Sequence, residues 1–332
     1  VQTCALPIYC MAPIVATQPS WFYVMVVVTV LLLTELKHTF TEFAQRMKND
    51  EMITLAKFLA ISGIILPMLP HKNLIPDINL TPYSIWLATV VVSGISYLSY
   101  LLKRYVFHES GTLVSGIIGG LYSSTATISV LARKSRKASE LEATDYVAAM
   151  LLAVSMMFLR FMILILIFSR EIFLSIYPYL LTMAVVAAIV AWFIHSRQKR
   201  PEDQPAETEE DDSSNPLEFK VALIFAVLFV IFTFLTHYTL VYAGTGGLNL
   251  LSFVSGFSDI TPFILNLLQN TGSVAALIIT ACSMQAIISN IMVNMFYALF
   301  FAGKGSKLRP WILGGFGVVI ACNLVLLLFF YI

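Results

Sequence analysis

Small and hydroxyl residues crowd one apolar stretch of this chain, GIIGGLYSSTATISVLAR at residues 116–133. Glycines allow two backbones to approach closely, and they make a helix easy to break. Hydroxyl groups would then stand where backbone amides and carbonyls are freed, and these residues are Ser123, Ser124, Thr125 and Thr127. Such a stretch could bind an ion or a small solute. The alternative is that the hydroxyls only satisfy a broken backbone or pack helices together.

A weaker copy of this stretch lies at residues 254–268, VSGFSDITPFILNLL. The aligned pairs are Gly120 with Gly256, Ser123 with Asp259, and Thr125 with Thr261. We expect a helix break in each copy, near 120–124 and near 256–262, because glycine and proline weaken a helix. The residues expected to make the breaks are Gly119, Gly120, Gly256 and Pro262.

Four polar residues deep inside apolar sequence are candidates for the site as well. Asp259 and Arg160 are ionisable, and such groups are costly at membrane depth unless they face a cavity or a partner. Asp259 is predicted to bind a cation or a proton; the alternative is a buried structural ion pair with Arg160. Asn290 and Asn294 are four residues apart and share a helix face. Their amides could flank the site or join neighbouring helices.

The composition places the chain in the membrane. Of its 332 residues, 58% are hydrophobic and 12% are charged, and many apolar runs are long enough to span a bilayer. A net charge of +1 gives no reason to expect nucleic-acid binding. The sequence has no HExxH, GxSxG, phosphate-loop or CxxC motif, so we expect neither an enzyme nor a cofactor, and no particular metal is indicated.

Two sets of four apolar segments, in residues 82–194 and 217–331, follow the same order and predict an internal repeat. The acidic stretch between them, 195–216, is expected to be a disordered linker. Residues 1–8, VQTCALPI, back-translate to a common sequencing-adapter end and are expected to be an artefact. Residues 9–50 then read as the end of a truncated membrane domain, and 51–332 as one membrane module.

The distribution of Lys and Arg predicts how the glycine-rich segments sit. If all ten apolar segments cross, these residues divide almost equally between the two sides. If both glycine-rich segments dip in and return, only Lys72 and Arg170 remain opposite the rest. Cytoplasmic loops prefer Lys and Arg, so we predict an all-α protein with about eight transmembrane helices and two re-entrant segments in an inverted repeat. About ten plain spans is the alternative.

Seven stretches resemble the long MgtC/SapB-type bacterial membrane proteins, in the C-terminal module known as domain of unknown function 4010. They lie at 51–70, 79–102, 110–136, 156–160, 215–226, 255–267 and 289–305, and GGLYSSTAT is the most specific. Residues 21–48 resemble the end of the preceding MgtC-like domain. The chain departs from the family pattern where Thr261 replaces a second acid and where Asn294 stands near a frequent Lys.

The resemblance implies a multi-pass protein of the bacterial inner membrane. We interpret the chain as a carrier-type transporter of a small ion or polar solute, with a divalent cation among the candidates. The alternative is a non-transporting regulator of the MgtC type that binds a protein partner. The expected partners are lipid and the transported solute, and a second copy of the chain is a further candidate.

Overall fold

The computed structural model describes residues 28, 49–75, 78, 80–107, 111–136, 140–197, 219–269, 275–303 and 308–331. The chain divides into two units, residues 1–57 and 58–332, and apart from the start of α3 all that follows concerns the second unit. The sequencing-adapter prediction for residues 1–8 falls outside the described residues, and so do most of the truncated-domain prediction for 9–50 and most of the linker prediction for 195–216. The linker was predicted to begin too early, because residues 195 and 196 end helix α7.

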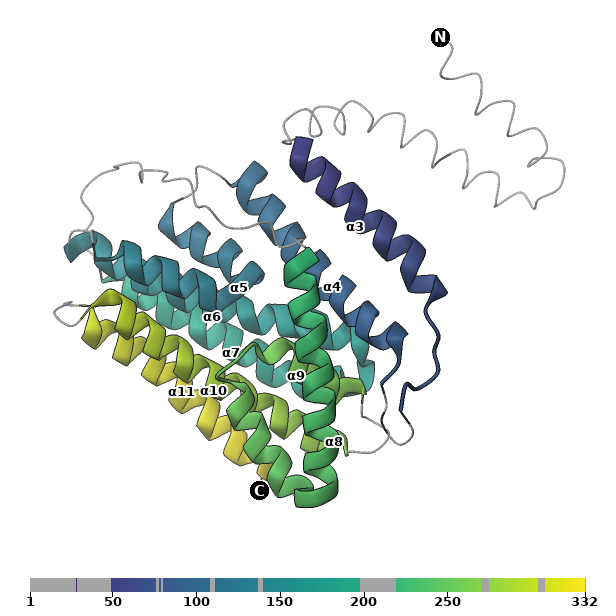
Figure 1. Ribbon diagram of the computed structural model, residues 1–332. Coiled ribbons are helices and arrows are strands. Elements are labelled where there is room, and N and C mark those ends of the chain that lie inside the picture. Colours follow the sequence, from purple (N-terminus) through teal and green to yellow (C-terminus); the bar gives the residue numbers. More distant parts are fainter. Residues whose placement is uncertain are drawn as a thin grey trace, which may run out of the picture. The chain divides into compact units, whose positions relative to one another are not determined.

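Helices account for nearly all of the described chain (Figure 1). They are α3 (Asn49–Met68), α4 (Pro82–Leu101), the π-helix η1 (Leu102–Val106), α5 (Thr112–Lys134), α6 (Glu140–Phe168), α7 (Arg170–Ser196), α8 (Phe219–Ser255), α9 (Ile260–Gln269), α10 (Ala276–Ala302) and α11 (Arg309–Tyr331). Seven of the described helices, α4 to α8, α10 and α11, are long and apolar enough to cross a membrane. The predicted class, an all-α polytopic membrane protein, is confirmed.

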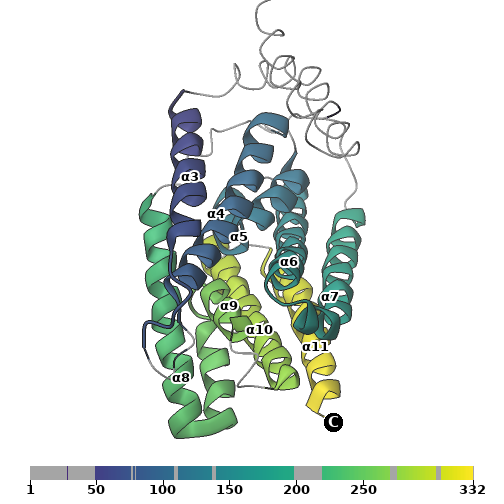
Figure 2. The ribbon, with the colours of Figure 1, turned by 90° about the vertical axis from the view of Figure 1, so that its right-hand side faces the viewer.

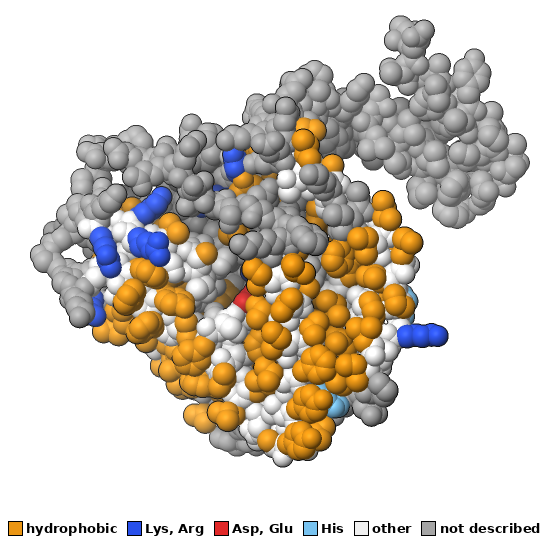
Figure 3. Space-filling model, in the orientation of Figure 1, with side chains coloured by type: hydrophobic (Ala, Val, Ile, Leu, Met, Phe, Trp, Pro, Cys, Tyr) orange, Lys and Arg blue, Asp and Glu red, His pale blue; other side chains and the backbone are white. Residues whose placement is uncertain are grey.

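The core of the second unit is a helical bundle in which α6 packs against both α5 and α7, and α10 contacts α5, α8 and α11 (Figures 1 and 2). Large hydrophobic side chains remain exposed on the outside, including Trp192 and Phe296. Figure 3 shows such side chains over much of the lower part of one face, with several Lys and Arg side chains at the upper left and one at the right-hand edge. This distribution suits helices whose outer surface contacts lipid hydrocarbon and whose ends reach water.

Helix α5 is broken at Ser123, which has extended backbone angles, φ −158° and ψ 107°. We call residues 112–122 α5a and residues 124–134 α5b. A Cβ atom built at Gly119 would lie 2.5 Å from Thr127 Oγ1. Eight residues of a straight helix span about 12 Å, so α5b folds back along α5a.

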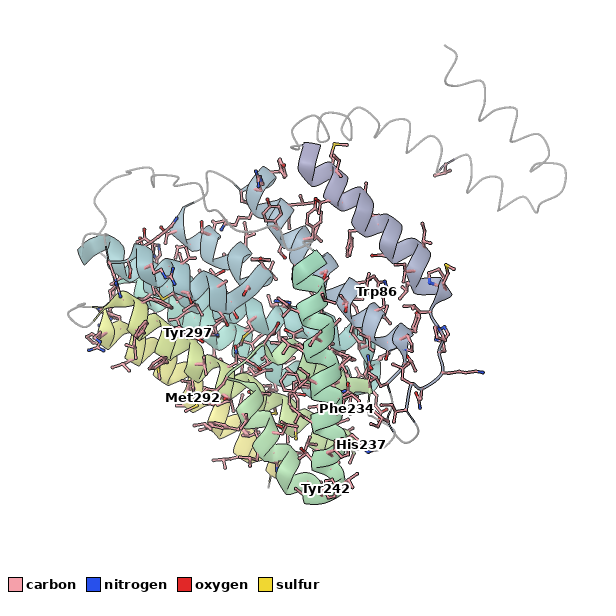
Figure 4. All side chains as sticks on the ribbon, viewed as in Figure 1. Trp86, Phe234, His237, Tyr242, Met292 and Tyr297 are labelled. Atoms are coloured by element: carbon pink, nitrogen blue, oxygen red, sulfur yellow. The ribbon has the colours of Figure 1, made fainter. Side chains whose placement is uncertain are left out.

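Helix α8 also reverses its direction, at Gly244. This glycine has φ 59° and ψ −151°, a conformation that residues with a side chain rarely adopt. We call residues 219–243 α8a and residues 245–255 α8b. A Cβ atom built at Gly247 would lie 2.8 Å from Thr239 Cγ2, which again requires a reversal. Figure 1 shows the two green arms of α8 joined by a turn, and Figure 4 places Tyr242 at that turn.

Close glycine contacts fix the direction of α5a. A Cβ atom at Gly116 would lie 2.8 Å from Ala149 Cα, and one at Gly120 would lie 2.5 Å from Ala153 Cα. The residue numbers rise together in the two helices, so α5a runs parallel to α6. Because α5a and α6 run the same way, α5b must carry the chain back before α6 begins.

The second half repeats this arrangement with α8b and α10. Cys282 Sγ lies 3.4 Å from Asn249 Oδ1, and Ser289 Oγ donates to the Phe253 carbonyl at 2.7 Å, so α8b runs parallel to α10. The end of α10 lies where α6 begins, because Arg136 Nη2 donates to the Phe300 carbonyl at 3.1 Å. Helices α6 and α10 are therefore antiparallel, and α5a and α8b enter the bundle from opposite ends.

The tight α5a–α6 contact gives a prediction for Gly120→Ala. The new methyl group would meet the Ala153 backbone, so we expect a loss of about 1–3 kcal/mol in the free energy of unfolding. Gly94→Ala in α4 is the matched control, because a Cβ atom there meets nothing within 4 Å. That variant should be neutral or stabilised by about 0.5–1 kcal/mol. Thermal unfolding of the purified protein measures both, and equal effects would contradict the contact.

Candidate functional site

The two breaks open onto one cavity of about 460 Å³. It is bordered by α4, both parts of α5, α6, α8a, α10 and the segment between α8b and α9. Its polar lining consists of Ser93, Ser96, Tyr122, Ser123, Ser124, Thr125, Arg160, Ser258, Asp259, Thr261, Asn290 and Tyr297. Figure 3 shows an acidic side chain in a hollow between hydrophobic ones, and Figure 4 labels Tyr297 on α10. Seven of the nine residues predicted to bind the substrate line this cavity.

Ser123 makes the first break and caps the helix that follows it. Its Oγ accepts a hydrogen bond from the Ala126 amide at 3.3 Å, as an N-cap residue does with the third amide of a helix. The amides of Ser124 and Thr125 begin α5b, where a helix has no internal carbonyl to offer them. Gly119 and Gly120, predicted to make the break, are buried helical residues whose role is close packing.

Asp259 takes the same place before α9. Its Oδ1 accepts a hydrogen bond from the Thr261 amide at 2.9 Å, and the side chain is exposed. The chain is non-helical from Gly256 to Asp259, so the second break lies within its predicted range. Pro262 stands inside the first turn of α9, where its missing amide costs no helical hydrogen bond.

Helix α9 is held in place by buried contacts with α8a. Asn266 Nδ2 donates to Thr233 Oγ1 at 2.7 Å, and the rings of Phe232 and Phe263 lie 5.6 Å apart. Residues 260–268 are all buried. The start of α9 is therefore fixed beside the cavity.

Arg160 sits where α5a ends. Its Nη1 donates to the Tyr122 carbonyl at 2.9 Å, and its Nε is enclosed without a hydrogen-bond partner among the described residues. The Asp259 carboxylate acts on it electrostatically. Within the described residues the two side chains make no direct ion pair; both line the cavity, Arg160 from α6 and Asp259 from the segment before α9.

Asn290 and Asn294 belong to a network that supports the second break. Asn290 Nδ2 donates to the Gly256 carbonyl at 3.2 Å, and Asn294 Nδ2 donates to Asn290 Oδ1 at 3.1 Å. Asn294 is fully buried and does not line the cavity. Thr127 does not line it either, because it packs beside Gly119 within the α5 hairpin.

Several lining residues were missed by the sequence analysis. Ser93 and Ser96 of α4 follow Thr89 at helical spacing and form a polar stripe, which was a usable signal. Tyr122, Ser258 and Tyr297 carried no such signal, because a tyrosine or serine in a transmembrane helix commonly packs or bonds its own backbone.

The fold defines a multi-pass membrane protein with two oppositely directed broken helices around one polar cavity. The chain belongs to the family described as Domain of unknown function (DUF4010), which matches residues 90–302. That range includes the entire cavity lining. The chain is also similar to an uncharacterized protein from Aquifex aeolicus (strain VF5), with 24% identity over 227 residues, 67% of this chain and 96% of that protein. No solved structure matches the chain significantly.

The cap at the first break predicts the effect of Ser123→Ala. Loss of the hydroxyl leaves the Ala126 amide without its partner, which should cost about 1 kcal/mol of the free energy of unfolding. Ser129→Ala on the same helix is the control. The Ser129 hydroxyl bonds only the Thr125 carbonyl, at 2.8 Å, so its loss should stay within about 0.5 kcal/mol. If thermal unfolding ranks the two variants the other way, Ser123 does not hold the break.

Proposed function

We propose that this protein is a carrier-type transporter of a small ion or polar solute, with its binding site in the cavity between the two helix breaks. One observation supports this most: α5b and α9, which begin at breaks in oppositely directed segments, both start at a cavity lined by Arg160 and Asp259. Broken helices that meet near the membrane midplane form a common substrate site in transporters. Charged residues at such depth are costly, so those that are kept usually mark a functional site.

The proposal includes a topology. The two hairpins, α5a–α5b and α8b–α9, would be re-entrant from opposite sides of the membrane, because their first halves run in opposite directions. Irregular backbone at this depth is tolerated when it lines a cavity or is buried in protein. The excess of Lys and Arg then faces the cytoplasm, and we place the protein in the bacterial inner membrane, surrounded by lipid.

Cysteine labelling tests this topology. Lys103→Cys before α5, Lys134→Cys at its last residue and Arg197→Cys after α7 should all react with an impermeant maleimide from the cytoplasmic side. Arg170→Cys, at the start of α7, should react from the opposite side and serves as the internal control. Reaction of Lys103→Cys and Lys134→Cys from opposite sides would instead make α5 a plain crossing.

Transport itself is tested by two-sided access to the cavity, which needs no known substrate. In a chain whose four native cysteines are replaced, Ser96→Cys and Ser258→Cys should each react with an impermeant thiosulfonate from both sides of oriented vesicles. A carrier must expose its site alternately to the two sides. Ser155→Cys, buried where Ser155 Oγ bonds the Ala184 carbonyl at 2.7 Å, is the unreactive control.

A regulator that acts through a protein partner needs no such access. Reaction of both cavity cysteines from one side alone, or from neither, would therefore overturn the transport proposal. Equal reaction of Ser155→Cys would show that the vesicles or the fold had failed, and the comparison would be repeated in intact cells.

A further inference from the structure

The hydrogen-bonding groups around the cavity are unevenly used. A break frees carbonyls at the end of the first half-helix and amides at the start of the second. Carbonyls would attract a cation and amides an anion. The bonding state of each set therefore indicates the charge of the ligand.

Three carbonyls at or near the breaks are already bonded by the protein. The Tyr122 carbonyl accepts from Arg160 Nη1, and the Gly256 carbonyl accepts from Asn290 Nδ2 at 3.2 Å. One turn earlier, the Phe253 carbonyl accepts from Ser289 Oγ at 2.7 Å. Asp259 is the single carboxylate among the described lining residues, and its Oδ1 accepts a hydrogen bond from the Thr261 amide. In the described residues no group of three His, Cys, Asp or Glu side chains could hold a metal.

The donors are not used up in the same way. A guanidinium has five N–H groups, yet among the described residues the structure gives Arg160 one hydrogen bond, from Nη1 to the Tyr122 carbonyl. Its Nε is enclosed and has no partner among them, so the donors left for a ligand are the other N–H groups of Nη1 and Nη2. An arginine fork matches the two oxygens of a carboxylate or an oxyanion. The amides at the start of α5b add further donors beside it, and the cavity size suits a small organic or inorganic ion.

The charges around the cavity nearly balance among the described residues. The starts of α5b and α9 each contribute roughly half a positive charge, and the ends of α5a and α8b each contribute roughly half a negative charge. Arg160 adds a full positive charge and Asp259 a full negative one. The class of the ligand is therefore indicated by the hydrogen-bonding groups left unused, not by the net charge.

We infer that the ligand of this cavity is a small anion, a carboxylate or a tetrahedral oxyanion, which is bound by Arg160 together with the amides that begin α5b. This inference rests on the proposed function and specifies its substrate class. The Asp259 carboxylate opposes such a ligand, so neutralising Asp259 should strengthen binding, whereas it would weaken the binding of a cation.

Thermal stabilisation of the purified full chain tests the inference, because a ligand that binds the folded state raises its stability. The probes are the sodium salts of succinate, glutamate, phosphate and sulfate, with magnesium chloride and choline chloride for comparison. We expect at least one of the four anions to raise the melting temperature saturably. Succinate or glutamate acting alone would identify a carboxylate site, and phosphate or sulfate an oxyanion site.

Three variants test the sign of the charge on the ligand. Arg160→Gln should weaken anion binding roughly tenfold to a hundredfold, since a charge-assisted hydrogen bond is lost. Arg160→Lys keeps the charge and a donor to Tyr122, and should bind more tightly than Arg160→Gln. Asp259→Asn should tighten binding severalfold because a like charge is removed, and asparagine still caps α9.

Matched controls carry the same changes outside the cavity. Asp145→Asn alters an acid bonded to His195 at 2.6 Å, and Arg136→Gln alters an arginine bonded to the Phe300 carbonyl; neither should change the affinity. Saturable stabilisation by magnesium that Asp259→Asn abolishes, or no stabilisation by any of the four anions, would overturn the inference. Two-sided cysteine access would still support transport in that case, while anion binding with one-sided access would reject transport alone.

Discussion

A broken helix leaves backbone groups without their helical partners, and the need to satisfy them shapes both halves of this protein. Each unpaired group costs several kcal/mol in hydrocarbon. The long helix that follows each hairpin donates a hydrogen bond to a freed carbonyl. Arg160 of α6 donates to the Tyr122 carbonyl, and Asn290 of α10 donates to the Gly256 carbonyl. The residues Ser123 and Asp259 supply acceptors for the freed amides. The breaks are therefore held from two sides, by a cap within the hairpin and by a neighbouring helix.

The two halves meet this need with different chemistry. The first half uses a charged donor and a neutral cap, and the second uses neutral donors and a charged cap. The inverted arrangement of the backbone thus brings one arginine and one aspartate to the same cavity from different repeats. Neither half contains both charges, so the polar character of the site arises only when the two repeats are assembled.

Much of this arrangement could be predicted from the sequence, because its signals are local. Glycine, serine and threonine at 116–127 and the aspartate at 259 marked both breaks, and the apolar runs marked the helices. The assignment of roles was less successful, since side chains that line a cavity and side chains that hold a backbone have the same composition. Thr127 and Asn294 share the residue types of the lining but pack behind it. The reversal at Gly244 also depended on tertiary packing. A glycine beside Thr245, Gly246 and Gly247 is as typical of an ordinary loop as of a tight reversal between two helices.

The contact of Gly116 and Gly120 with α6 has a mechanical consequence. Backbone lies directly against backbone there, and such an interface has no side-chain rotamers that could change to let the helices slide. Helices α5a and α6 therefore behave as one stiff plate. The facing wall, from α8a, presents Ile224, Phe225 and Leu228, whose side chains can adopt other rotamers. We therefore expect the cavity to change its width more readily at the α8a wall than at the α5a–α6 contact.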